Sequence, residues 1–174
     1  MEEWKKEDDK ILKQWVDKAK CYTLMHMSSY RKYKSRNSMF TIPVIIISTL
    51  TGSANFAQIT FQNYEHITSV VIGTLNIIVG IITTIYHFLK IAEQSESHKS
   101  AASGWGKFYE FVNLEFSKHF VDRESPIKII KYCAEQYEHL IDSSPVIPEE
   151  IISKFRDSHK DMTFPNVCSA RVVI

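Results

Sequence analysis

Hydrophobic residues follow two different patterns along the chain, and each pattern predicts a different kind of helix. Within residues 1–37 they recur at steps of three and four, which is the period of one face of an α-helix. We therefore expect an amphipathic helix here, with a polar and basic C-terminal end. Its apolar face would hold Ile11, Trp15, Ala19, Tyr22 and His26.

Two long stretches without Lys, Arg, Asp or Glu follow, at residues 39–61 and 67–89. A helix of either length is about 34 Å long, and the hydrocarbon core of a bilayer is about 30 Å thick. The short connection Gln62–His66 requires the two helices to be antiparallel neighbours. A buried hairpin in a soluble core is the alternative, but the length and similarity of the stretches favour a transmembrane hairpin.

Residue types that start and end helices suggest further boundaries. Pro43 falls in the first turn of the first stretch, where its missing N–H costs little, so we interpret it as a helix start. Ser125 and Pro126 suit an N-cap and a first helical position, and predict the start of another helix. A short helix is expected at residues 148–158, and residues 161–174 show no period.

The second stretch has no obvious end. Its helical period continues, so we expect one helix over Ile67–Phe120 that leaves the membrane, with a bend at Gly104 or Gly106 as an alternative. Trp105 lies on the continuing face and should be buried in a cytosolic helical region at residues 90–160. The predicted fold is a single-domain all-α membrane protein, with an amphipathic helix, a two-helix hairpin and a helical cytosolic part.

The distribution of basic residues predicts the orientation of the hairpin. Lys and Arg precede the first stretch and follow the second, and Gln62–His66 contains neither, so both termini should be cytosolic. The formal net charge of +1 provides no basic field of the kind that attracts nucleic acid. The expected partner is therefore a lipid bilayer, and the expected localisation is an integral membrane one.

Small and polar residues recur at steps of three and four along the second stretch. We call them the polar stripe: Ser69, Gly73, Asn76, Gly80, Thr83 and His87. The first stretch has a weaker counterpart in Ser48, Gly52 and Asn55. Such a stripe is typical of close packing, either between the two spans or between protomers, and it is also the composition of a water-filled pore wall. Lipid exposure is disfavoured because Asn55 and Asn76 would lack hydrogen-bond partners.

Motifs that carry chemistry are absent from the sequence. It has no His-Glu-x-x-His or Cys-x-x-Cys pair, no phosphate-binding glycine loop and no nucleophile elbow. The three cysteines, Cys21, Cys133 and Cys168, are far apart. We therefore expect no catalytic residue, no cofactor and no metal site, and a protein that is not an enzyme.

The order of these segments resembles the SLATT family of two-transmembrane effector domains associated with nucleotide-based conflict systems. The resemblance covers about Trp4 to Phe155. It rests on Trp15 and Tyr22-Thr23-Leu24-Met25-His26, IPVIIISTLTGSANF, IGTLNIIVGIITTI, FLKIAEQSESHKSAASGWGKF and YEHLIDSSPVIPEEIISKF.

The resemblance implies a non-enzymatic membrane effector that forms homo-oligomers and pores, with a nucleotide sensor as a partner. Stand-alone relatives also occur in large DNA viruses. They imply an alternative, in which a structural protein of a virion internal membrane tethers the bilayer to a scaffold or capsid protein.

Overall fold

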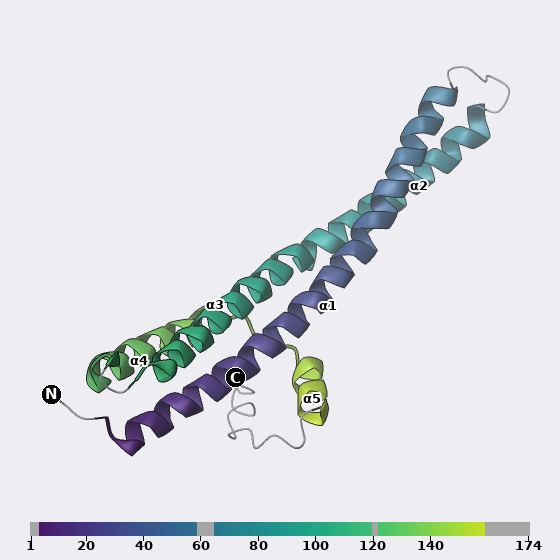
Figure 1. The fold of residues 1–174 in the computed structure, drawn as a ribbon. Coiled ribbons are helices and arrows are strands. Elements are labelled where there is room, and N and C mark those ends of the chain that lie inside the picture. The colour runs from purple at the N-terminus through teal and green to yellow at the C-terminus, as the bar shows by residue number, and fades with distance from the viewer. Residues whose placement is uncertain (1–3, 59–64, 120–121, 159–174) are drawn as a thin grey trace. The chain divides into compact units, whose positions relative to one another are not determined.

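The computed structural model describes residues 4–58, 65–119 and 122–158. Over these residues the protein is all-α and contains no strand, as the sequence predicts. The helices, in chain order, are α1 (Lys6–Gln58), α2 (Glu65–Phe88), α3 (Ile91–Ser117), α4 (Pro126–Ser143) and α5 (Glu149–Ser158) (Figure 1). The tail 161–174, the segment 59–64 and Phe120 lie outside the described residues.

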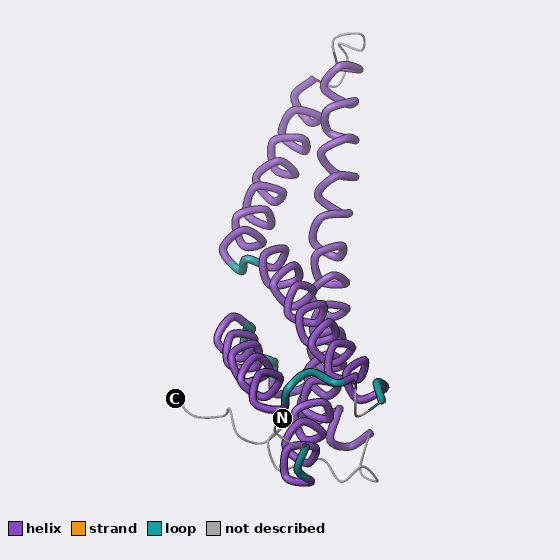
Figure 2. Tube along the Cα trace, turned by 60° about the vertical axis from the view of Figure 1, so that its left-hand side comes forward, coloured by secondary structure: helices purple, strands orange, loops and turns teal. Residues whose placement is uncertain are grey.

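The chain folds as two compact units. We call residues 1–31 and 95–174 the bundle, and residues 32–94 the hairpin. Helix α1 contributes residues to both units, and so does α3. In the hairpin, the C-terminal part of α1 and the whole of α2 lie side by side and antiparallel (Figure 2).

The amphipathic segment and the first uncharged stretch belong to a single helix, because α1 runs through both. The interpretation of Pro43 as a helix start was wrong, since Pro43 lies well inside α1. The residues before it include neither glycine nor proline, so nothing interrupts the helix there. The ring of Pro43 deprives the Met39 carbonyl of its helical N–H, a cost that membrane helices tolerate better than soluble ones.

The prediction of one helix over Ile67–Phe120 was also wrong. Helix α2 ends at Phe88, and α3 begins at Ile91 after a turn. Lys90 adopts a left-handed backbone conformation with φ of 48°, and its N–H bonds to the His87 carbonyl at 3.1 Å. A left-handed residue ends a helix because the next N–H groups can no longer reach carbonyls four residues earlier. Gly104 and Gly106, the alternative sites for a bend, both lie inside α3, so neither glycine ends the helix.

The break changes which residues of the chain point inward. The buried and half-buried row of α2 comprises Thr68, Ile72, Leu75, Val79, Ile82 and Tyr86. Its continuation at the same spacing would be the polar positions 93, 96, 100 and 103. The buried row of α3 comprises Ile91, Ser95, His98, Ala102 and Trp105 instead, two positions later. Because of the break, the buried rows of α2 and α3 are two positions out of phase along the sequence.

The core of the bundle forms around Trp105, which is fully buried as predicted. Its ring stacks on that of Tyr22 at 4.6 Å and meets that of Tyr137 edge-on at 5.3 Å. Its indole N–H donates to the Ser144 hydroxyl at 3.0 Å. Helices α1, α3 and α4 supply the rest of the core: Leu12, Val16, Ala19, Ala101, Phe108, Val112, Ile129 and Cys133.

The two C-terminal helices begin where the sequence indicates. Helix α4 starts at Pro126 with Ser125 as N-cap, although the Ser125 side chain makes no capping hydrogen bond. Helix α5 places the buried Ile151 against Cys21 and Met25 of α1.

Candidate membrane-spanning hairpin

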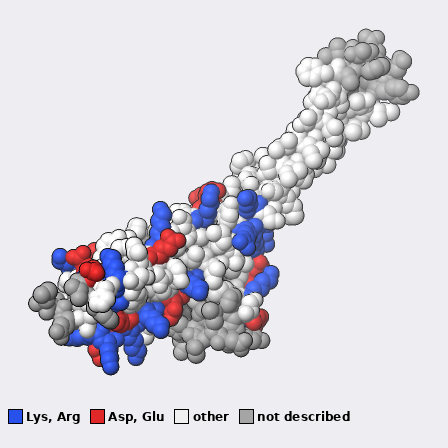
Figure 3. Space-filling model, viewed as in Figure 1, with Lys and Arg blue, Asp and Glu red and all other residues white. Residues whose placement is uncertain are grey.

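Two helices of the structure are long and apolar enough to cross a membrane. In each, only 6% of the most apolar 18-residue stretch is buried, whereas the core helix of a soluble protein would be mostly buried. Large side chains such as Leu50, Phe56 and Ile77 are at least 64% exposed. Lys, Arg, Asp and Glu cover the bundle but are lacking over most of the hairpin (Figure 3). The described part of this chain therefore leaves a long apolar surface uncovered.

The two helices of the hairpin meet along one narrow face. On α1 this face comprises Asn37, Phe40, Val44, Ile47, Thr51 and Ala54, and on α2 it is the row from Thr68 to Tyr86. Thr51 and Ile72 are the most buried, at 4% and 6% exposure. The Tyr86 hydroxyl donates to the Asn37 side-chain oxygen at 2.5 Å, and the Tyr86 ring lies against Phe40. This contact closes the end of the hairpin that carries the basic residues.

Hydroxyl groups on the hairpin surface are bonded within their own helices. Thr49, Ser53, Thr74 and Thr84 each donate to the carbonyl four residues earlier, at 2.8–2.9 Å. Because a hydrocarbon environment offers no partners, such bonds would satisfy these hydroxyl groups if they faced lipid.

The polar stripe lies beside the face that joins the two helices, not on it. Each stripe residue follows a residue of the inward row by one position, so the stripe is rotated by about 100° around α2. Thr83 is half-buried at the edge of the contact, and the other five stripe residues are exposed. A Cβ atom built on Gly73 or Gly80 would meet nothing within 4 Å.

The counterpart on α1 shows the same arrangement. Ser48 and Asn55 are exposed and Gly52 is half-buried, and a Cβ on Gly52 would also meet nothing within 4 Å. Most of the stripe residues and their counterparts therefore lie off the contact between the two helices of the hairpin. Of the interpretations that the sequence favours, packing between protomers and a pore wall fit this exposure.

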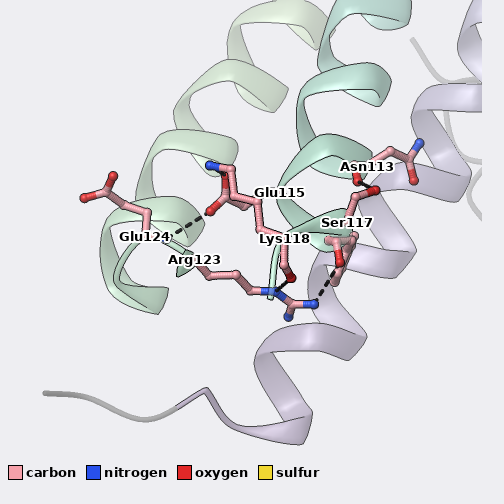
Figure 4. A network of polar contacts seen from close by, with 7 residues as sticks. Asn113, Glu115, Ser117, Lys118, Arg123 and Glu124 are labelled. Carbon is pink, nitrogen blue, oxygen red and sulfur yellow. Dashed lines mark hydrogen bonds and ion pairs between the residues drawn. The ribbon is translucent and has the colours of Figure 1, made fainter. Parts of the chain in front are cut away.

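Charged groups of the bundle are organised around the buried Glu115, near the start of α4 (Figure 4). Its carboxylate accepts hydrogen bonds from Lys118 at 2.6 Å and from the Glu124 backbone N–H at 2.9 Å. Arg123 pairs with Asp9 of α1 and donates to the Phe116 carbonyl. Burial opposes the charge of Glu115, but these hydrogen bonds and cations outweigh burial and lower its pKa. The network stabilises the packing of α1, α3 and α4.

A second polar contact of the bundle escaped the sequence analysis. His26 of α1 and His98 of α3 are almost completely buried, and their Nδ1 atoms lie 3.0 Å apart. Both histidines fall on predicted inward faces, but nothing in the sequence relates two positions 72 residues apart. Their meeting depends on the way α1 and α3 pack.

The described residues show no arrangement for metal or thiol chemistry. None of the described His, Cys, Asp and Glu side chains form a group of three that could hold a metal ion. Cys21 and Cys133 are buried, and burial, together with Glu115, raises the pKa of the Cys133 thiol to about 11. Cys168 lies outside the described residues.

No protein-family model, curated protein or solved structure matches the chain. The resemblance to the SLATT family therefore remains a prediction from the sequence pattern.

Proposed function

We propose that the protein is a non-enzymatic, two-span membrane protein that assembles through the polar stripe and permeates the bilayer as an effector. The observation that carries the proposal is the surface of the hairpin. Over residues 37–58 and 66–89 this surface is largely apolar and holds no Lys, Arg, Asp or Glu. It also leaves a row of small and polar residues mostly outside the contact between its own helices.

The glycines of the stripe support assembly between copies. Small residues allow membrane helices to approach closely, and a neighbouring asparagine or serine can bond across the contact. Gly73, Asn76 and Gly80 recur on successive turns of α2, and all three are exposed in the single chain. A second helix seated there would also give Asn76 a partner.

The stripe can be tested without damaging the hairpin itself. A leucine at Gly80 would enter open space in the single chain, so we expect Gly80→Leu to insert normally but to reduce crosslinking between copies. Thr74 is exposed on another face of α2, so Thr74→Leu makes a small-to-leucine change away from the stripe. This control should crosslink as well as the wild type.

Asn76 distinguishes a pore from a packed assembly. If Asn76 lines a wet passage, Asn76→Leu should dry the constriction and stop ion release from liposomes while crosslinking survives. If Asn76 only bonds across helices and the water passage lies elsewhere, the change should weaken the contact by about 0.6 kcal/mol and leave ion release nearly intact. Wild-type protein that inserts and crosslinks but releases no ions would contradict the pore. The structural alternative, a tether between a bilayer and a scaffold or capsid protein, would then replace it.

A further inference from the structure

His26 and His98 are two titratable side chains of the described bundle that are buried against each other. The two residues are 1% and 0% exposed, and the centroids of their rings lie 5.2 Å apart. The contact joins α1 to α3 and lies next to the aromatic core, because Tyr22 packs on both His26 and Trp105.

The 3.0 Å separation of the two Nδ1 atoms constrains their protonation. One Nδ1 must donate its proton and the other must accept it, so at least one imidazole has to be neutral. If both imidazoles were protonated on both nitrogens, two N–H groups and two positive charges would face each other in a buried contact. Such an arrangement would separate the rings.

The side chains that pack next to the pair include uncharged and apolar groups from α1 and α5. From α1, the Tyr22 ring faces His26, and the Cys21 thiol is buried five residues before it. From α3, Lys99 is exposed, pairs with Glu96 at 3.4 Å and lies over the Tyr30 ring. Helix α5 and the segment before it pack apolar residues, Ile147, Ile151, Ile152 and Phe155, against this part of α1.

We propose that His26 and His98 form a proton-sensitive latch that holds α1 against α3 at neutral pH and releases the contact on acidification. This inference concerns the bundle alone and does not rest on the proposed membrane activity. Its physiological counterpart would be a compartment or a cell state of acidic pH, in which the latch loosens the bundle.

The direction of the pH dependence follows from the electrostatics of the site. Burial and the charge of His98 lower the pKa of His26 from 6.5 to about 4, and burial lowers the pKa of His98. At pH values between 6.5 and the lowered pKa values, the two histidines bind more protons in the unfolded chain than in the folded bundle. The stability of the bundle therefore falls as the pH falls below about 6.5. The loss is complete once the pH is below the folded pKa values.

The test compares the full-length wild type with the double variant His26→Asn/His98→Asn in detergent micelles. An asparagine amide places a donor and an acceptor near the position of Nδ1 but does not titrate. All three tryptophans, Trp4, Trp15 and Trp105, lie in the bundle, so tryptophan fluorescence follows its unfolding by urea. His139→Asn is the matched control, because His139 is exposed on α4.

We expect the unfolding constant of the wild type, relative to the double variant, to rise on the order of tenfold from pH 6 to pH 5. His139→Asn should behave as the wild type does. Equal pH dependence in the wild type and the double variant would overturn the latch.

A second measurement keeps the proposal testable if the double variant does not fold. Histidine side-chain NMR of the wild type should show two of the seven histidines titrating well below the others. The single variants would assign these two signals to His26 and His98. Seven histidines that all titrate near pH 6.5 would contradict the latch, whatever the state of the variant.

Discussion

The bundle and the hairpin are built partly from the same helices, but their side chains are distributed in opposite ways. In the bundle, α1 and α3 bury Leu12, Trp105 and Val112 at no more than 1% exposure. In the hairpin, α1 and α2 leave residues such as Leu50 and Ile77 at least 64% exposed. The charged residues follow the reverse pattern, since they cover the bundle and are lacking over most of the hairpin (Figure 3).

The difference shows that one helix can be suited to two environments along its length. The bundle buries apolar side chains in its core and exposes charged side chains on its surface, as is typical of proteins in water. The hairpin hides its polar backbone in helices and shows apolar side chains outside, as hydrocarbon requires. The polar groups of the two regions also differ in their partners. The bundle buries a network around Glu115, whereas surface hydroxyls of the hairpin bond to their own helices.

The largest difference in stability between a bundle variant and a hairpin variant should come from Trp105→Ala. Removing a fully buried indole leaves a cavity, and we expect a loss of about 3–5 kcal/mol in the stability of the bundle. Urea unfolding, followed by the fluorescence of the two remaining tryptophans, measures the loss. Ile77→Ala is the control in the hairpin. Because Ile77 is 67% exposed, this substitution should leave bundle unfolding unchanged. A Trp105→Ala bundle as stable as the wild type would mean that the core is not where the structure places it.

A smaller effect is expected at the two glycines of α3. A Cβ on Gly106 would make an ordinary contact at 3.8 Å with the Thr23 methyl group, so Gly106→Ala should gain up to about 1 kcal/mol in helix propensity. A Cβ on Gly104 would lie 2.7 Å from Cδ2 of Leu140, so Gly104→Ala should gain less or lose stability. Urea midpoints that rise equally in both variants would argue against the close approach of α4 at Gly104.

Much of the fold could be predicted from local signals in the sequence. The two uncharged stretches predicted long apolar helices, and Ser125 with Pro126 predicted the start of α4. The helical period after the second span placed Trp105 on an inward face, where the structure has it. These features depend on composition and spacing within one segment, so they needed no knowledge of how segments pack.

The features that were missed depend on contacts between segments or on a costly backbone conformation. Lys90 adopts a left-handed conformation that costs about 1–2 kcal/mol and usually favours glycine, so no residue type marked the break. The sequence did contain one signal of the break, because the apolar rows before and after Lys90 are out of phase. Two other features could not be predicted without the orientation of neighbouring helices. One is the contact between His26 and His98, and the other is the exposure of the polar stripe.

The most direct test of the account asks whether the hairpin crosses a bilayer. Cys21 and Cys133 are buried and unsuited to labelling, so the experiment needs introduced cysteines in a Cys168→Ser background. Ser103 is exposed on α3 of the bundle, and Asn63 lies in the connection between the spans, outside the described residues. Single Ser103→Cys and Asn63→Cys variants are then treated in intact cells with a membrane-impermeant maleimide.

The account predicts that Asn63→Cys reacts in intact cells and that Ser103→Cys reacts only after permeabilisation, because basic flanks favour the cytosolic side of a membrane. Reaction of both cysteines only after permeabilisation, in protein that is correctly folded, would contradict a membrane-spanning hairpin.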